Sequence, residues 1–230
     1  MARPSPRSPA QTEVRAAAVR RMPRECSAAP TPELRDACIA AAREAIARKG
    51  IESLSLRDVA RRLGVSHQAP YKHYPSRDHL LAEVMRRCFQ QFAQHLDARK
   101  HFDDPHQDLE SLGLQYLSYA QQHPLEYRLM FGTPWPAATE HSVLLHNSTH
   151  AFDILRQVLR RIHGTGAKHS ERVDLDAMFV WSTMHGLVGV MHGDCIDKLG
   201  LQQKMLGRVV QHVMDGVARG LSAAGRTQPA

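Results

Sequence analysis

Two short helical segments joined by a tight turn constrain what this chain can fold into more than any other feature of its sequence. Ser55 stands where an N-cap is needed, Asp58 follows three residues later as a capping-box partner, and Gly64 supplies the left-handed position that ends the first segment. A second short helix is expected over residues 67–74. The first segment carries four apolar residues at the spacing of one helix face: Leu56, Val59, Ala60 and Leu63. Two helices joined in this way have the dimensions of a helix-turn-helix.

The polar side chains of this motif are expected to face outwards. His67, Gln68 and Lys72 can project from the N-terminal end of the second helix, which enters the major groove of DNA in this motif. Glutamine can pair with adenine and lysine with guanine, each good contact giving roughly 1–3 kcal/mol of discrimination. Further side chains on either side are placed to contact phosphates: Ser55, Arg57, Tyr71, His73 and Arg77.

Pro70 modifies the expected second helix. It falls at the fourth helical position, where its missing N–H removes the first backbone hydrogen bond of the helix. The start of this helix is therefore predicted to be 3₁₀-like.

The rest of the chain predicts more helices and no strand–turn–strand signal. Proline, glycine and aspartate breaks separate a long helix that Ser76 caps from segments at 105–122, 124–131, 138–162, 175–192 and 202–222. The predicted fold is all-α. A disordered basic tail at 1–31 precedes a three-helix DNA-binding domain at 32–83 and a larger helical ligand-binding and dimerisation domain at 84–226.

The positive charge of the chain is concentrated at one end. The formal net charge is +7, and +6 of it lies in residues 1–83. A basic end on a nearly neutral body indicates an anionic polymer bound at that end. For residues 1–31 alone, a solvated basic tail is an equally good explanation.

Cellular location follows from what the sequence lacks. No apolar stretch reaches the length of a transmembrane helix, and the basic N-terminus has no apolar run of a secretory signal. The expected location is therefore the cytoplasm, in association with the nucleoid.

The four cysteines form no CxxC pair, so free, packed thiols are expected, with redox sensing by Cys88 or Cys195 as the minor alternative.

The segment 57–81 resembles the tetracycline-repressor (TetR) family of regulators. The similarity covers about fifty residues, 34–83, and its specific part is the spacing from Gly64 through Tyr71 and Tyr74 to Arg77. The resemblance implies that an aromatic at Tyr74 packs the domain, while the positions of Tyr71, His73 and Arg77 contact phosphates. Most members have lysine in place of Arg77. They commonly have threonine in place of Ala69, which leaves the DNA contact of that threonine without a counterpart here.

A second motif, Trp181 followed by His185 and Gly186, resembles the Trp-His-Gly signature of one TetR C-terminal subgroup. Membership of the family implies a homodimer joined by the last two long helices, and a cavity for a small ligand in the same domain. It also implies repression as the usual mode of control. The apolar stripe of the predicted helix at 202–222 fits either that dimer face or burial within one subunit.

Aromatic and sulfur-containing side chains are the candidates for the wall of such a cavity, since they tolerate varied apolar ligands. The predicted ligand-binding residues are Tyr116, Tyr119, Phe131, Trp135, Phe152, Met178, Trp181 and His185, with Met130 and Met184 beside them. Ordinary core packing explains each of them as well.

Three other functions compete with the regulator. His146 and His150 have the i, i+4 spacing of a zinc site, but no third ligand is recognisable, and neither a metal nor another cofactor is expected. An enzyme is not expected, because the nucleophile-elbow, P-loop and dinucleotide-binding motifs are all missing. A nucleoid protein that binds DNA without sensing a ligand shares every N-terminal feature with the regulator and stays as the alternative.

Overall fold

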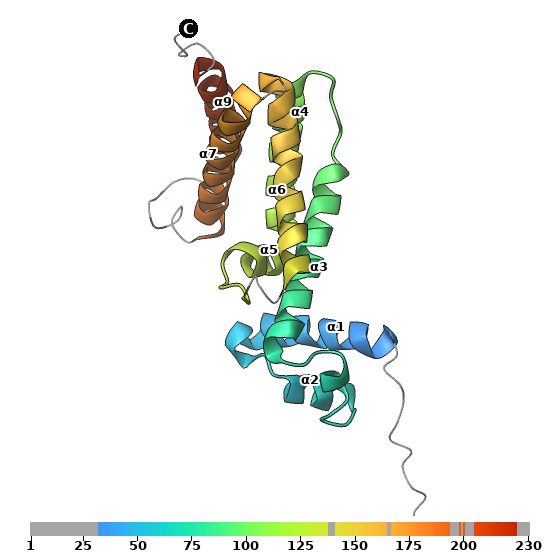
Figure 1. Cartoon of the computed structure of the whole chain (residues 1–230). Coiled ribbons are helices and arrows are strands. Elements are labelled where there is room, and N and C mark those ends of the chain that lie inside the picture. Colours follow the sequence, from blue (N-terminus) through green and yellow to red (C-terminus); the bar gives the residue numbers. More distant parts are fainter. Residues whose placement is uncertain are drawn as a thin grey trace, which may run out of the picture.

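The computed structural model describes residues 32–137, 141–164, 167–193, 198, 200 and 205–224, and the regular structure in this part of the chain is helical (Figure 1). In chain order the elements, with η for 3₁₀, are α1 (Pro32–Lys49), η1 (Ile51–Ser53), α2 (Leu56–Leu63), η2 (Pro70–Lys72), α3 (Arg77–Asp97), α4 (Pro105–Gln122), α5 (Pro124–Phe131), α6 (Ser142–His163), α7 (Ala167–His192) and α9 (Leu206–Ala224). The all-α prediction is confirmed. The expected tail at 1–31 lies outside the described residues.

The N-terminal elements pack on the apolar stripes seen in the sequence. Cys38 and Ile46 of α1 and Val59 of α2 are at most 1% exposed. Helix α1 contacts α2, η2 and α3, so it forms the centre of this small unit. The hydroxyl of Tyr74 donates to the Arg35 carbonyl of α1 at 3.2 Å, which ties the end of the motif to the same helix.

The turn after α2 follows from its glycine. Gly64 ends the helix at φ 66° and ψ 23°, the left-handed conformation that glycine adopts without steric cost. Ser55 is the N-cap residue, as expected, but its hydroxyl makes no capping hydrogen bond. The predicted capping box is therefore wrong, because the Asp58 carboxylate pairs with Arg61 one turn later.

The second helix of the motif is shorter than the sequence predicts. Of residues 67–74, only η2 is regular, and it is 3₁₀ rather than α. Proline has no N–H to donate to the Ser66 carbonyl, and the Ala69 N–H donates to it instead, at 3.0 Å. The next turn also closes over three residues, from the His73 N–H to the Pro70 carbonyl at 3.0 Å. The 3₁₀ start is confirmed, and the full helix is not formed.

Helix α3 connects the two ends of the molecule. It starts beside α1 and continues into the bundle of α4 and α6 (Figure 1). Its start is set by Ser76, whose hydroxyl accepts from the His79 N–H at 3.3 Å, so this predicted cap is confirmed. The helix passes the expected domain boundary at 83/84 without a break.

The remaining bounds agree with the sequence where local signals are strong. Prolines at the first positions of α4 and α5 reproduce the predicted 105–122 and 124–131 segments. Helix α7 begins at Ala167, earlier than the predicted start at 175. The sequence did not predict these first turns because they are polar and show no apolar stripe. The predicted starts of the 138–162 and 202–222 segments fall on residues outside the described ones.

Two observations bear on the thiols and on membranes. Cys38 and Cys88 are buried free thiols, and burial raises the pKa of Cys88 to about 12, which opposes thiolate chemistry there. Cys26 and Cys195 lie outside the described residues. Within the part of the chain that is described, no helix is long and apolar enough to cross a bilayer.

A buried ion cluster fixes α4 against α6 and the loop before it. The Asp108 side chain is 1% exposed and accepts from Arg99 of the α3–α4 loop at 3.3 Å and from Arg161 of α6. It also accepts from the Phe102 N–H at 3.4 Å. Arg99 is itself buried, and the carboxylate of Asp108 is the buried partner that compensates its charge.

Replacing Asp108 with alanine is expected to destabilise the fold by roughly 3 kcal/mol, since it removes the buried carboxylate that pairs with Arg99 and leaves only the exposed carboxylate of Asp97, 4.0 Å away. Urea unfolding followed by circular dichroism measures the change. Glu110→Ala, an exposed carboxylate on the same helix, is the control and should stay within about 0.5 kcal/mol of the wild type. Equal stability of the two variants would contradict this assignment.

Candidate functional site

The outward-facing residues of the helix-turn-helix lie at one end of the molecule, away from α7 and α9 (Figure 1). His67, Gln68, Tyr71 and Lys72 are exposed, with 42% of Tyr71 accessible. Arg57 on α2 is also exposed. Apart from Tyr71, these side chains are polar or basic, which fits contact with a nucleic acid.

Three other predicted DNA contacts are only partly accessible. Arg77 donates to the Ile51 carbonyl at 2.8 Å and to the Leu54 carbonyl at 3.2 Å, so it braces the segment before α2 against the start of α3. Its side chain is still 40% exposed. His73 and Ser55 are half-buried, and Nε2 of His73 is buried without a partner among the described residues.

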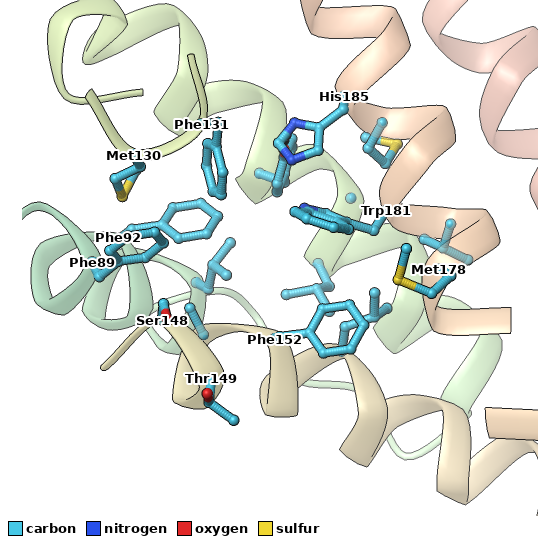
Figure 2. A pocket seen from close by; sticks show the side chains of 18 of the residues that line it. Phe89, Phe92, Met130, Phe131, Ser148, Thr149, Phe152, Met178, Trp181 and His185 are labelled. Carbon is cyan, nitrogen blue, oxygen red and sulfur yellow. Dashed lines mark hydrogen bonds between the residues drawn. The ribbon is translucent and has the colours of Figure 1, made fainter. Parts of the chain in front are cut away.

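A cavity of about 550 Å³ lies among α3, α4, α5, α6, α7 and α9. Its size is that of a site for a small organic molecule. Phenylalanine, leucine, methionine and tryptophan side chains make most of its wall (Figure 2).

The structure places seven of the eight predicted ligand-binding residues on this wall: Tyr116, Phe131, Trp135, Phe152, Met178, Trp181 and His185. Met130 and Met184 are there too. Tyr119 is the exception. It is 1% exposed, its hydroxyl donates to the Cys88 carbonyl at 3.4 Å, and its ring packs on Phe92 from the neighbouring face of α4.

Sequence reasoning missed the contribution of α3 and α9 to the cavity. Phe89, Phe92 and Leu96 of α3 line it, as do Met214 and Val217 of α9. The sequence shows these residues as apolar stripes, which predicts burial. A stripe does not show whether its side chains meet another helix or an open space.

One polar cluster interrupts the apolar wall. Nδ1 of His185 lies 2.7 Å from the Tyr116 hydroxyl and within hydrogen-bonding distance of the Tyr127 hydroxyl. The two hydroxyls are 2.9 Å apart. Tyr127, which is not among the ligand-binding residues predicted from the sequence, thus completes a three-membered cluster from α4, α5 and α7.

Burial controls the ionisation of this cluster. Burial lowers the pKa of His185 to about 4, so the imidazole is neutral near pH 7. It raises the pKa of Tyr127 to about 12 and that of Tyr116 further still. All three groups are therefore uncharged hydrogen-bonding groups.

Comparison with known families identifies both halves of the chain. Residues 39–84 match the family model described as bacterial regulatory proteins of the tetR family. Residues 109–225 match the model described as the tetracyclin repressor-like C-terminal domain. The chain belongs to the TetR family. The C-terminal match does not by itself distinguish the Trp-His-Gly subgroup.

Solved structures show the same TetR fold. A protein of unknown function from Rhodococcus sp. RHA1 is 24% identical, with a TM-score of 0.65 over 86% of this chain and 98% of that chain. The fatty acid degradation regulator FadR from Bacillus halodurans is 15% identical, with a TM-score of 0.59 over 81% and 95%. The TetR-family regulator PfmR from Thermus thermophilus is 18% identical, with a TM-score of 0.55 over 79% and 97%. No curated protein matches the chain.

Membership of the TetR family makes this chain a DNA-binding transcription regulator of helix-turn-helix type, and not an enzyme. Proteins of this family act as dimers and respond to small molecules. His146 and His150, the pair considered for zinc, are exposed on α6. Among the described residues no group of three potential ligands is arranged to hold a metal ion.

Helix α5 of this TetR-family fold contacts both functional regions. Glu126, which is 7% exposed, forms an ion pair with Arg43 of α1 in the DNA-binding unit. The next residue, Tyr127, belongs to the polar cluster at the cavity, and Phe131 lies on the cavity wall. No local pattern in the sequence indicates this ion pair, whose partners are 83 residues apart.

The His185→Gln variant is expected to lose less stability in acid than the wild type. The folded-state pKa of His185, about 4, lies below its ordinary value of 6.5, so between these pH values the unfolded chain binds a proton that the folded chain excludes. Stability from this group is complete above pH 6.5 and falls as the pH drops towards 4. The free energy of unfolding in urea, measured across this window, tests the difference. Tyr116→Phe keeps the histidine and should retain the wild-type loss, and parallel curves for His185→Gln and wild type would refute the assignment.

Proposed function

We propose that this regulator is a repressor that a small, largely apolar ligand releases from operator DNA. The observation that carries the proposal is that one helix, α3, is anchored in the DNA-binding unit at one end and lines the cavity further along. The protein would act in the cytoplasm, on DNA of the nucleoid.

Two connections support transmission from the cavity to the DNA. Through α3, a ligand pressing on Phe89 or Phe92 acts on a helix whose Glu83 lies 3.6 Å from Arg35 of α1. Through α5, the ligand acts on the helix that carries Glu126, whose carboxylate pairs with Arg43 of α1. A ligand changes DNA affinity only by binding the two conformations unequally, and a cavity wall shared with both helices provides a basis for such a difference.

The size of the cavity counts against the alternative of a nucleoid protein that senses no ligand. The cavity of about 550 Å³ is partly open to the surface, and its wall is mostly apolar. A concave apolar surface of this size is typical of a ligand-binding site. A protein that only binds DNA has no need for such a site.

We further propose that α7 and α9 form the homodimer interface. Leu175, Phe179, Gly186 and Val190 share one face of α7, at intervals of four, seven and four residues. The three large side chains are 45–64% exposed, and a Cβ at Gly186 would meet no atom within 4 Å. An apolar face with a small residue at its centre suits close packing against a second copy.

Such a dimer would read a palindrome. Two reading ends related by a two-fold axis fit half-sites about 34–36 Å apart, or a multiple of this spacing. The expected operator therefore has two similar half-sites.

The DNA-binding part of the proposal is tested by footprinting on the region upstream of the protein's own gene, followed by selection of preferred sequences. Gln68→Ala and Lys72→Ala are each expected to lose roughly 1–3 kcal/mol of discrimination at one base pair per half-site. Arg57→Ala is the matched control. It should weaken binding to all sequences alike and reduce the salt dependence, as loss of a phosphate contact does.

A uniform loss in all three variants would contradict this division of roles. If the wild type protects no segment at physiological salt, the operator proposal fails. Transcription from the protected promoter, measured with and without the protein, separates repression from activation.

The Phe179→Asp variant is expected to be largely monomeric, because a carboxylate on the proposed face would be buried without a partner. Sedimentation velocity at micromolar concentration measures the effect, with operator affinity as a second readout. Leu145→Asp introduces the same charge at a similarly exposed apolar residue of α6 and should leave the dimer intact. A dimeric Phe179→Asp protein would place the interface elsewhere.

A further inference from the structure

Most polar atoms on the cavity wall are already satisfied within the protein. The hydroxyls of Ser148 and Thr149 both donate to the Leu145 carbonyl, at 2.8 and 2.9 Å. The Trp135 indole N–H donates to the Met130 carbonyl at 2.8 Å. These groups have no hydrogen left to offer a ligand.

The polar cluster of Tyr116, Tyr127 and His185 has one N–H donor without an acceptor among the described residues. Two hydroxyl protons, on Tyr116 and Tyr127, are best used when one is donated to Nδ1 of His185 and the other to the neighbouring hydroxyl oxygen. The neutral imidazole then carries its proton on Nε2. No described residue accepts from Nε2, and the ring lies on the cavity wall.

A second donor stands beside it. Trp181 lies one helical turn before His185 on α7, and their ring centroids are 4.6 Å apart. Among the described residues, none accepts a hydrogen bond from the Trp181 indole N–H. Figure 2 shows both rings projecting from α7 into the space bounded by Phe92, Phe131 and Phe152.

The wall carries no formal charge. None of the described lining residues is Lys, Arg, Asp or Glu, and the imidazole is neutral. A carboxylate or phosphate would lose its hydration here without meeting a cation. A cation could find aromatic faces, but it would face two N–H donors and no anion.

We propose that the ligand of this cavity is an uncharged, largely apolar molecule whose carbonyl-type oxygen accepts from Nε2–H of His185 and the indole N–H of Trp181. A carbonyl oxygen has two lone pairs, so one atom can accept from both donors. The inference rests on the proposed function and names the chemical class of its ligand.

The test is a titration of the full-length protein with four eleven-carbon probes: methyl nonyl ketone, undecane, undecanoate and undecylammonium. The chain has two tryptophans, and both line the cavity, so intrinsic fluorescence reports occupancy directly. The ketone is expected to bind about a hundredfold more tightly than either ion, and about tenfold or more above undecane. Tighter binding of undecanoate or undecylammonium, or no binding of the ketone, overturns the proposal.

Substitutions of His185 test whether the ligand oxygen accepts a hydrogen bond from this residue. His185→Phe should weaken ketone binding about tenfold and leave undecane binding nearly unchanged, because one donor is lost and the wall stays apolar. His185→Gln, which retains an N–H donor, should keep part of the preference for the ketone. Ser182→Ala, on α7 but outside the cavity wall, is the control and should change nothing, since its hydroxyl donates to the Met178 carbonyl of its own helix. Melting temperatures confirm that each variant is folded, and equal ketone affinity in His185→Phe and wild type rejects the donor assignment.

The same probes are added to the operator complex. Release by undecanoate alone would reject the uncharged ligand while supporting a ligand-released repressor. Binding of the ketone without any change in DNA affinity would support the ligand class and count against release.

Discussion

The continuity of α3 is the constraint on which the rest of the structure depends. Its first residue, Arg77, holds two backbone carbonyls of the DNA-binding unit, and its middle supplies Phe89 and Phe92 to the cavity. A helix bends gently unless proline, glycine pairs or an inserted group breaks its hydrogen bonds, and α3 contains no proline or glycine. In the proposed mechanism, a displacement of α3 at the cavity would therefore be transmitted to its other end beside α1.

The wall of the cavity combines an aromatic shell with one polar cluster. Phe131 contacts Phe92, Tyr127, Trp181 and His185 at ring-centroid distances of 4.5–6.3 Å, largely edge to face. Such contacts fix side chains that would otherwise collapse into the space. In the proposed arrangement, the hydrogen bonds of the cluster to Nδ1 of His185 leave Nε2 as the donor that the wall presents to a ligand.

Several helix ends could be predicted from local signals in the sequence, although the capping box at Ser55 is not formed. Proline at the first turn, the Ser76 cap and Gly64 set helix ends by local geometry, and these features are as expected. The cavity could be anticipated only as a list of buried aromatic residues, because local periodicity does not contain the distances between helices. Tyr116 and Tyr119 illustrate this: both are buried on α4, but one turns to the cavity and the other to α3.

Helix α5 shows how contacts distant in sequence complete the function. Successive residues on a helix point about 100° apart, so two adjacent side chains can reach different neighbours. Glu126 therefore reaches Arg43 of the DNA-binding unit while Tyr127 reaches His185 at the cavity. Only the carboxylate of this ion pair is buried, since the Arg43 side chain is 36% exposed, so the pair contributes little net stability. Its value here is geometric, because it makes the position of α1 depend on the helix that the ligand would touch.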